Sequence, residues 1–236
     1  MVNATNANNG KYGIHMALNV IPRKHEPKAN CSLCPRLHDF RLSNKQKYTD
    51  WYNGPVYSFG KISSRLLIVG LAPGLRGANR TSRPFTGDWA GDLLFSTLSK
   101  FKLSQGTYMS KVDDGLELVD CRITNAVRCV PPENKPIGSE IKSCNNFLRQ
   151  EINSMVNLKA IITLGQIAHN ATLDALNLRK ADFKFKHGGK FVTERHIRVF
   201  SSFHCSRYNT NTGRLTPKMF ESVFEQAKKV LNSVNN

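Results

Sequence analysis

Four of the six cysteines have a spacing that suits a metal site. Cys31 and Cys34 form a C-x2-C pair, while Cys129 and Cys144 follow far downstream and fifteen residues apart. Four thiolates bind either a structural zinc ion or a [4Fe–4S] cluster, and the residue types alone do not separate the two. A compact zinc ribbon normally has a second C-x2-C pair, which this sequence lacks. These cysteines indicate a metal centre that joins the N-terminal part of the chain to residues 129–144.

The remaining cysteines, Cys121 and Cys205, lie in apolar surroundings and are predicted to be small core residues. The chain has no run long enough to cross a membrane and no signal-peptide core near its N-terminus. We therefore expect a cytoplasmic protein, in which a reducing environment keeps the thiols from forming disulfides.

The segment from Leu66 to Asp88 begins as an apolar run and continues as a long polar loop with four glycines, two prolines and three arginines. It lacks the G-x4-G-K-[ST] motif for nucleoside triphosphates and the G-x-G-x-x-G motif for dinucleotides, so both of these ligand classes are excluded. Gly70, Pro73 and Gly74 instead turn the chain sharply and let the backbone approach a ligand.

Two kinds of side chain in this loop suit a nucleic acid. The ring of Phe85 could stack on a base, or it could simply fill the core. The arginines could neutralise phosphates. They are Arg76, Arg80 and Arg83.

The whole chain is strongly basic, with 34 Lys and Arg against 17 Asp and Glu and a formal net charge of +17. Such an excess attracts a polyanion, most commonly nucleic acid, although it could also be a merely solubilising surface. The basic residues crowd into segments 76–83, 179–198 and 207–218. This clustering favours a nucleic-acid partner.

Short apolar runs alternate with amphipathic segments along the chain and predict alternating strands and helices. Ser139 is a possible N-cap of the second helix, Thr216 and Pro217 begin the closing helix, and KFKHGGKFV predicts a hairpin that turns on Gly188 and Gly189. Strands are predicted at 65–70, 122–127, 158–165 and 196–204, and helices at 90–101, 138–155, 166–176 and after Pro217.

This alternation predicts an α/β fold of three layers, with a central, mostly parallel, four-stranded sheet flanked by helices. Residues 1–29 show little periodicity and are predicted to be a loosely ordered arm, followed by a single domain at 30–236. Ligands bind such folds at the carboxyl ends of the strands. Three polar loops follow strand ends, after Gly70, Asn125 and His204, so we expect them to converge on one rim.

Three motifs resemble those of a known family: GLAPGLRGANRTSRPFTGD, ITNAVRCVPPENKP and NTNTGRLT. With the four spaced cysteines, they resemble the uracil-DNA glycosylase superfamily and are most similar to its family five, the iron–sulfur branch with broad specificity. The similarity extends from Cys31 to about Pro217. It implies a uracil-DNA glycosylase fold, and it implies a [4Fe–4S] cluster rather than zinc at the four cysteines.

The resemblance also implies roles for residues on the rim. His204 would hydrogen-bond the O2 atom of the base as charge develops there, although a histidine at a strand end is more often structural. Asn125 would read the edge of the base, or it could instead satisfy a loop backbone. Phe85 would stack on the flipped base. The base pocket would be completed by Gly70, Leu71, Ala72 and Gly74.

The chain departs from the narrow-specificity iron–sulfur relatives at Leu71, where their GEAPG-like motif has an acid. The attacking water must then be held by the backbone or by another carboxylate, and Asp88 is the best candidate. Asp88 could equally be the N-cap of the next helix. A pocket with fewer polar side chains rejects fewer bases, so hypoxanthine, hydroxymethyluracil and xanthine are expected substrates besides uracil.

A second departure is Cys205, because many members of the superfamily have proline after the histidine. Arg207 and Tyr208 stand where relatives push a wedge into the duplex, and Arg214 is expected to contact phosphate. No lysine stands out as a Schiff-base nucleophile, so base excision without strand cleavage is predicted.

We therefore expect a monomeric, monofunctional DNA glycosylase that excises deaminated bases from DNA in the first step of base excision repair. Its abasic product would pass to downstream repair enzymes. Three alternatives stay open: a cluster-bearing nucleic-acid-binding protein without catalysis, a glycosylase restricted to uracil, and a structural zinc protein.

Overall fold

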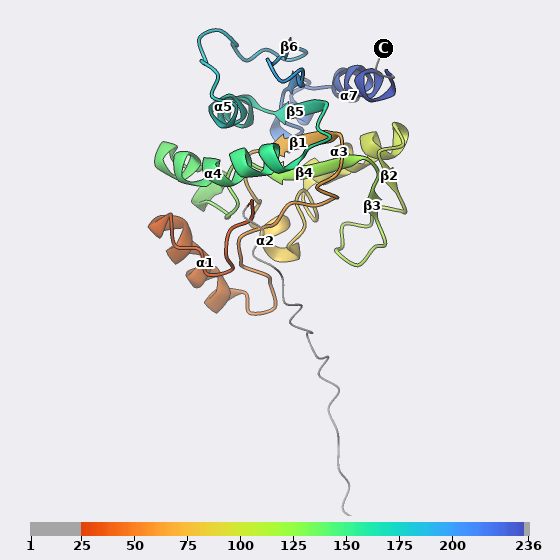
Figure 1. Ribbon diagram of the computed structural model, residues 1–236. Helices are drawn as coiled ribbons and strands as arrows, with labels where there is room; N and C mark the ends of the chain where they lie inside the picture. The colour runs from red at the N-terminus through yellow and green to blue at the C-terminus, as the bar shows by residue number, and fades with distance from the viewer. Residues whose placement is uncertain (1–24, 234–236) are drawn as a thin grey trace, which may run out of the picture.

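Five strands form the central sheet of the computed structural model, which describes residues 25–233 (Figure 1). The first four strands across the sheet are parallel, and the fifth, an edge strand, is antiparallel to its neighbour. The predicted α/β class and mostly parallel sheet are confirmed, but the predicted number of four strands is wrong because of this edge strand. In order across the sheet, the strands are β4 (Cys121–Asn125), β1 (Leu66–Gly70), β5 (Ala160–Leu164), β7 (Arg198–Ser202) and β6 (Lys190–Val192).

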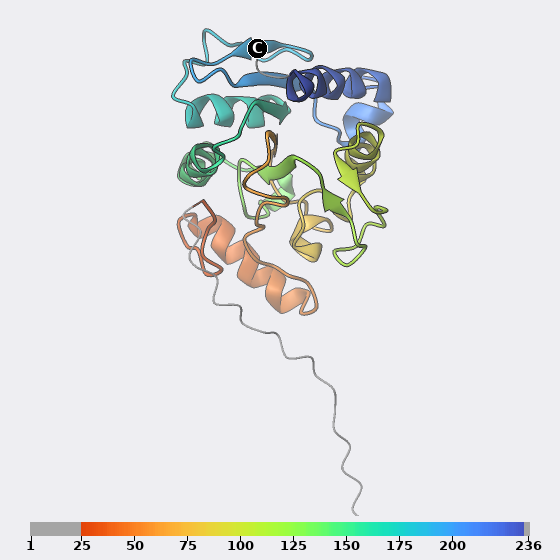
Figure 2. The ribbon, with the colours of Figure 1, turned by 45° about the vertical axis from the view of Figure 1, so that its right-hand side comes forward.

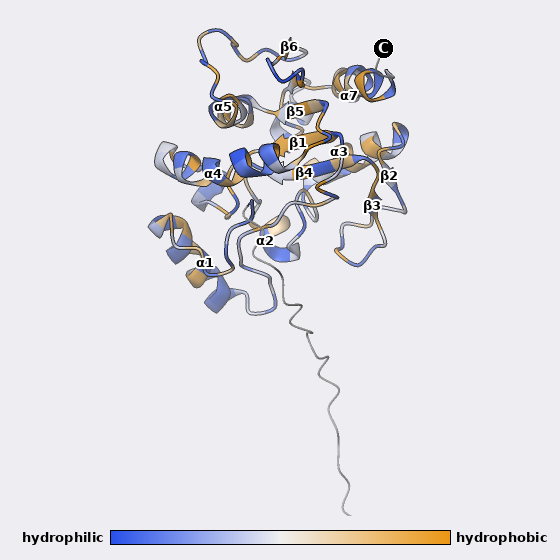
Figure 3. Ribbon diagram, in the orientation of Figure 1, coloured by the Kyte–Doolittle hydropathy of each residue, from blue (hydrophilic) through white to orange (hydrophobic). Residues whose placement is uncertain are grey.

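Helices cover both faces of the sheet. Every residue of β1, β4 and β5 is buried, so both faces of these strands must be covered. Helices α3 (Trp89–Lys100) and α7 (Pro217–Asn232) lie on one face, while α4 (Gly138–Ser154) and α5 (Gln166–Ala175) lie on the other. Figure 3 shows β1 and β5 in apolar colours and both colours on α7, as expected of a helix with one face on the sheet.

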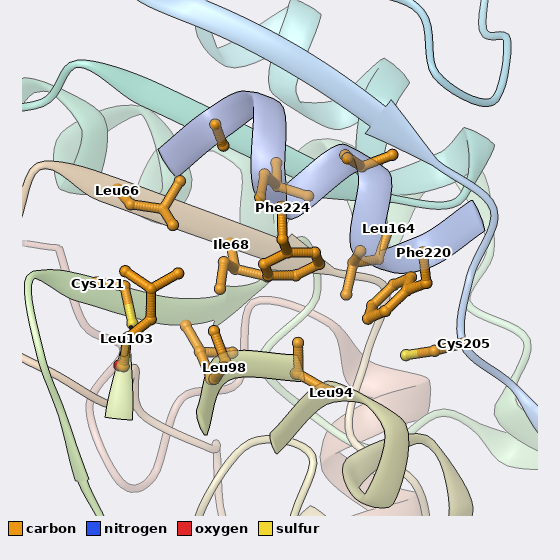
Figure 4. Packing of buried hydrophobic residues seen from close by; sticks show 14 of the residues in the cluster. Leu66, Ile68, Leu94, Leu98, Leu103, Cys121, Leu164, Cys205, Phe220 and Phe224 are labelled. Atoms are coloured by element: carbon orange, nitrogen blue, oxygen red, sulfur yellow. Dashed lines mark hydrogen bonds between the residues drawn. The ribbon is translucent and has the colours of Figure 1, made fainter. Parts of the chain in front are cut away.

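Successive side chains of β1 enter different cores because side chains alternate along a strand. Figure 4 shows Leu66 and Ile68 facing Leu94 of α3 and Phe224 of α7. The intervening residues Leu67 and Val69 pack instead with α4 and α5. The predicted core positions Cys121 and Cys205 are fully buried, which confirms them as core residues.

The ends of two helices test the predicted caps. Helix α7 begins as predicted, because the Thr216 hydroxyl accepts a hydrogen bond from the Met219 N–H at 3.2 Å. Ser139 is not the cap of α4. The N-cap residue is Ile137, whose N–H donates to the Glu140 carboxylate at 2.8 Å.

The predicted hairpin on Gly188 and Gly189 is wrong. The two glycines precede β6, which pairs with β7 through a turn at residues 193–197. The segment before the glycines does not pair as a strand. The Phe183 carbonyl bonds the Nε2 atom of His169 at 2.7 Å, and the Phe183 ring contacts the Phe191 ring at a tilt of 35°.

Several elements had no counterpart in the sequence prediction. Helix α1 lies at one end of the molecule and β6 and β7 at the other (Figure 2). Of the predicted arm at 1–29, residues 1–24 lie outside the described part. No helix within residues 25–233 has the length and apolar character needed to cross a bilayer. The additional elements are α1 (Pro35–Lys47), α2 (Ala78–Thr81), β2 (Ser104–Gln105), β3 (Glu117–Leu118), a 3-10 turn (Pro132–Asn134) and α6 (Arg207–Asn211).

Candidate active site

A cavity of about 690 Å³ opens at the carboxyl ends of β1, β4 and β7. All three predicted loops contribute to it, which confirms that they converge on one rim. Its volume lies in the range of sites for small ligands. The lining includes Leu71, Ala72, Pro73, Gly74, Leu75, Arg76, Gly77, Phe85, Asp88, Trp89, Asn125, Asn134, His204, Ser206 and Arg207.

Two glycines, Gly70 and Gly77, leave room for the side chains of Asn125, Phe85 and Asp88. A Cβ atom on Gly70 would collide with the Oδ1 atom of Asn125 and with the ring of Phe85. A Cβ atom on Gly77 would collide with the carboxylate of Asp88. The loop backbone passes directly against these three side chains, so a larger residue at Gly70 or Gly77 would displace them.

Asn125 ends β4 and is 3% exposed. Its Oδ1 atom has no hydrogen-bond partner among the described residues. A buried carbonyl oxygen without a partner costs about 1–3 kcal/mol, so this atom suits the N–H group of a ligand in the cavity. This oxygen therefore does not satisfy the loop backbone, and the base-reading role of Asn125 stays a prediction.

Phe85 fills the core, which confirms that interpretation of this ring, and it also lines the cavity. Its φ of +56° is in the left-handed region, which is costly for a bulky side chain. Tyr108 holds this backbone, because its hydroxyl bonds both the Phe85 carbonyl and the Gly87 N–H at 3.2 Å. The Phe85 ring lies 5.9 Å from the ring of His204, with the two planes 25° apart.

His204 follows β7 and lines the cavity. Burial lowers the pKa of its imidazole to about 4, so the ring is neutral at neutral pH and can donate one N–H. The Nδ2 atom of Asn209 in α6 donates to the His204 carbonyl at 2.8 Å. This bond fixes the backbone that carries the ring.

Asp88 serves as a helix cap and also lies on the cavity. It is the N-cap of α3, where its Oδ1 atom accepts from the Gly91 N–H at 3.3 Å. It also lines the cavity, with its Oδ2 atom on the side of Gly74 and Gly77. Burial raises the pKa of this carboxyl.

The exposed basic residues surround this opening. Arg76 and Arg207 line the cavity, and Arg80 is exposed beside Arg76. Arg214 lies over the ring of Phe203 at 4.6 Å and lines a second cavity beyond His204. Tyr208 is 71% exposed at the start of α6. All of these side chains can meet a ligand outside the protein.

The predicted phosphate contact at Arg83 is wrong, because this guanidinium is occupied inside the protein. It is 5% exposed and donates to both carboxylate oxygens of Asp114 at 2.8 and 2.7 Å, and to the Lys111 carbonyl at 2.6 Å. The Arg83 hydrogen bonds hold the pKa of Asp114 well below its usual range. Arg83 therefore anchors the loop before Phe85 to residues 109–116.

The structure brings the four predicted metal-binding cysteines into one neighbourhood. Cys129 and Cys144 are buried against Leu37, with Cys34 beside them, and no disulfide joins them. Burial raises the pKa of Cys34 to about 11 and that of Cys129 to about 12, and in both cases the other thiols of the group add to the effect. No group of three or more His, Cys, Asp or Glu side chains in residues 25–233 is arranged to hold a metal ion as it stands.

Some residues that line the cavity were not predicted from the sequence. Trp89 is the most prominent, because it is 48% exposed on the cavity and its Nε1 atom donates to the Thr210 hydroxyl at 2.9 Å. The sequence could have indicated its exposure, because Trp89 directly follows the Asp88 cap and lies outside the apolar stripe of α3. Asn134 reaches the cavity from two consecutive left-handed residues, Glu133 and Asn134, which no local pattern predicts.

Comparisons with known proteins agree with this geometry. A family model described as the uracil DNA glycosylase superfamily matches residues 57–228. A Type-5 uracil-DNA glycosylase of Pyrobaculum aerophilum is 39% identical over 84% of this chain and 88% of its own length. Proteins with the same name from Thermus thermophilus and Mycobacterium leprae are 38% and 36% identical, over 85% and 89% of this chain and 93% and 95% of their own lengths.

Arg83→Ala should lower the free energy of unfolding by roughly 3–5 kcal/mol, because it leaves the Asp114 carboxylate buried without its cation. Urea denaturation measures this loss. The matched control is Arg80→Ala, an exposed arginine in the same loop, which should change stability by less than about 0.5 kcal/mol. Equal stability of the two variants would contradict the anchoring role of Arg83.

Proposed function

The chain belongs to the uracil DNA glycosylase superfamily, and from this premise we propose that it hydrolyses the N-glycosidic bond of several deaminated bases in DNA. Uracil-DNA glycosylase activity is common to the Type-5 relatives by name, and the protein is an enzyme of this kind. The proposal extends the substrates to hypoxanthine, hydroxymethyluracil and xanthine. It makes the reaction the first step of base excision repair, which leaves an abasic site for downstream enzymes.

The unpaired Oδ1 atom of Asn125 is the observation that carries the proposal. Deamination of cytosine or adenine converts a ring nitrogen that accepts a hydrogen bond into an N–H group that donates one. Uracil, hypoxanthine and xanthine share this N–H, and a buried acceptor at the cavity would pair with it. Cytosine and adenine would leave the acceptor unpaired, which disfavours them.

Normal thymine and guanine also carry such an N–H, so a further step must exclude them. A base must leave the duplex to reach the cavity, and this costs least where the base is mispaired. Uracil opposite guanine and hypoxanthine opposite thymine are mispaired. The cost of flipping therefore protects the normal bases that Asn125 alone would accept.

In the chemical step, the bond between C1′ and the base nitrogen breaks, and its electron pair leaves with the base. Neutral His204 can donate its N–H to a base oxygen where negative charge accumulates, and the Phe85 ring can stack on the flat base beside it. A donor that is fixed before the reaction stabilises the leaving base without reorganisation. The pocket thus favours departure of the base over binding of the intact nucleotide.

Water then adds to C1′ and loses a proton. Asp88 is the carboxylate on this cavity that can orient the water, because one oxygen caps α3 and the other lies on the cavity side. Its raised pKa makes it a better proton acceptor than an exposed aspartate. No residue from Gly70 to Gly74 has a carboxylate side chain that could orient the water.

The apolar character of the Leu71 side supports a wide substrate range. Leu71, Ala72 and Pro73 line the cavity without offering a hydrogen bond from a side chain. Exocyclic groups that differ among uracil, hydroxymethyluracil and the purines would meet no unsatisfied polar partner here, so few bases are rejected.

The exposed cations around the cavity would hold the DNA. Arg76, Arg80 and Arg214 are placed to neutralise phosphates. Arg207 and the exposed Tyr208 begin α6 at the cavity mouth, where a side chain could enter the gap that the flipped nucleotide leaves.

Cys31, Cys34, Cys129 and Cys144 would hold a [4Fe–4S] cluster. The donor set fits, because two buried thiols, Cys129 and Cys144, lie close to the partly buried thiols of Cys31 and Cys34 from a distant part of the chain, and the Arg128 N–H points at the Cys144 sulfur at 3.5 Å. When bound, the cluster would link residues 31–34 to the loop after β4.

Labelled duplexes containing a uracil–guanine pair, a hypoxanthine–thymine pair or only normal pairs provide the test of function. Incubation followed by hot alkali should cleave at uracil and at hypoxanthine, and strands without alkali should stay intact. Cleavage at uracil alone would contradict the wide substrate range. No cleavage at any lesion, with DNA binding retained, would instead support a binding protein without catalysis.

His204→Ala should slow excision by about 10²–10³-fold, the usual effect of losing one donor to a developing anion. DNA binding should change little. Because the pKa of His204 is lowered to about 4, the ring stays neutral at higher pH. The ratio of wild-type to variant kcat/KM should therefore be constant between about pH 5 and pH 8. A step in this ratio near the ordinary histidine pKa would contradict a neutral donor.

Cys129→Ser should remove bound iron and the brown colour of an iron–sulfur protein. Metal analysis and the visible absorption spectrum measure both. Cys121→Ser is the matched control, because its hydroxyl can keep the bond that the Cys121 thiol makes to the Leu103 carbonyl. Iron retained in Cys129→Ser would contradict the ligand set, and zinc in the wild type would contradict the cluster.

A further inference from the structure

Trp89 leaves a large aromatic surface exposed at the mouth of the cavity. It is the first residue of α3, it is 48% exposed, and its neighbour Ala90 is buried. An indole in this position forgoes the free energy of burying its apolar surface. The ring also lies on the same cavity as Asn125 and His204, so its exposed surface continues that of the pocket.

Two contacts from α6 fix the orientation of this ring. The Nε1 atom donates to the Thr210 hydroxyl at 2.9 Å, which satisfies the only hydrogen-bond donor of the indole. The guanidinium of Arg207 lies over the ring at 5.3 Å. A cation over an indole is attracted by its π-face. The exposed surface that remains is therefore apolar, flat and held in place.

The surroundings point to a nucleobase as the ligand of this surface. Arg207 and Arg76 lie on the same cavity and would draw the sugar–phosphate chain past Trp89. Bases next to a flipped nucleotide lose a stacking partner, and aromatic side chains replace such partners in proteins that bind single strands. Under the proposed function, the flipped base stacks on Phe85. Trp89 is therefore available to stack on a base next to the flipped nucleotide.

From these contacts we infer that Trp89 is a subsite that stacks the base adjacent to the excised nucleotide on the same strand. This inference rests on the proposed glycosylase function and adds a residue that binds DNA outside the base pocket. It makes the rate of excision depend on a base that is not itself removed.

Single-stranded oligonucleotides with one uracil provide the test. In two further substrates, the nucleotide on the 5′ or the 3′ side of the uracil lacks its base but keeps its sugar and phosphate. Wild-type kcat/KM should fall by about 5- to 150-fold on one of these two substrates, the range that corresponds to loss of one base–aromatic stack. Trp89→Ala should be slow on the complete substrate by a similar factor and should show little further loss when the neighbouring base is removed.

Three control variants separate stacking from a structural role. Trp89→Phe keeps a flat ring without the N–H, and Thr210→Val removes the hydroxyl that accepts from it, so both should remain sensitive to the missing base. Tyr57→Ala removes an aromatic residue that is 42% exposed and does not line the cavity, and it should behave as the wild type. If Trp89 only braced α3 against α6, Thr210→Val would resemble Trp89→Ala.

The outcomes are distinct. A wild type that ignores both missing neighbours, or a Trp89→Ala variant that keeps the wild-type sensitivity, overturns the stacking subsite and leaves the proposed function intact. A sensitivity that appears only in duplexes, and depends on the opposite strand, also overturns it. No uracil release from the complete oligonucleotide overturns the inference, and no release from a duplex with the same uracil opposite guanine overturns the proposed function as well.

Discussion

Two buried arginines and two buried glutamates form the interaction on which the arrangement of this protein depends. Arg122 and Arg128 are each 1% exposed, and each meets one oxygen of Glu151 at 2.6 Å and one oxygen of Glu26 at 3.0 Å. Burial alone would raise the pKa of Glu151, but the two guanidiniums bring it below its ordinary value. The four charges cancel, and loss of any one would leave an uncompensated buried ion, which is far more costly than the pair is stabilising. Three parts of the chain are thereby fixed together: β4 with the loop after it, helix α4, and the segment that begins the described residues.

The candidate site is built on the same strand and loop that this ion-pair network holds. Asn125 lines the cavity and sits between the two arginines in sequence, at the end of β4, and its Oδ1 atom is buried against Gly70 without a partner among the described residues. The loop after β4 continues to Cys129, and α4 carries Cys144 along with Glu151. The Asn125 amide and two of the four cysteines are thus positioned by one set of ion pairs. A metal centre at the cysteines would join the same loop and helix a second time, so the site would be braced from both sides.

The parts of the fold that could be predicted from the sequence are those with a local signal. Apolar runs located the four parallel strands, and loops after their carboxyl ends located the cavity, because parallel strands end at the same edge. Arg83 could not be placed, because a loop arginine paired with a distant buried aspartate has the same local sequence as one that faces solvent. Helix α1 was missed because most of its residues are polar and its few apolar residues form no strong amphipathic pattern. The edge strand β6 was assigned the wrong partner, because it pairs with β7, the next strand along the chain, and not with the segment before Gly188.

The cavity is not held equally on all sides. Asn125 and Phe85 are packed into the sheet and its core, whereas α6 has no buried residue and is held by the bonds from Thr210 to Trp89 and from Asn209 to the His204 carbonyl. Elements with few buried contacts open or shift at the lowest free-energy cost. The side of the pocket formed by Asn125 and Phe85 is therefore rigid, while the side formed by α6 shifts most easily. Under the proposed function, such a site would keep one rule for the base, an N–H opposite Asn125, and still accept bases of different size from strands of different shape.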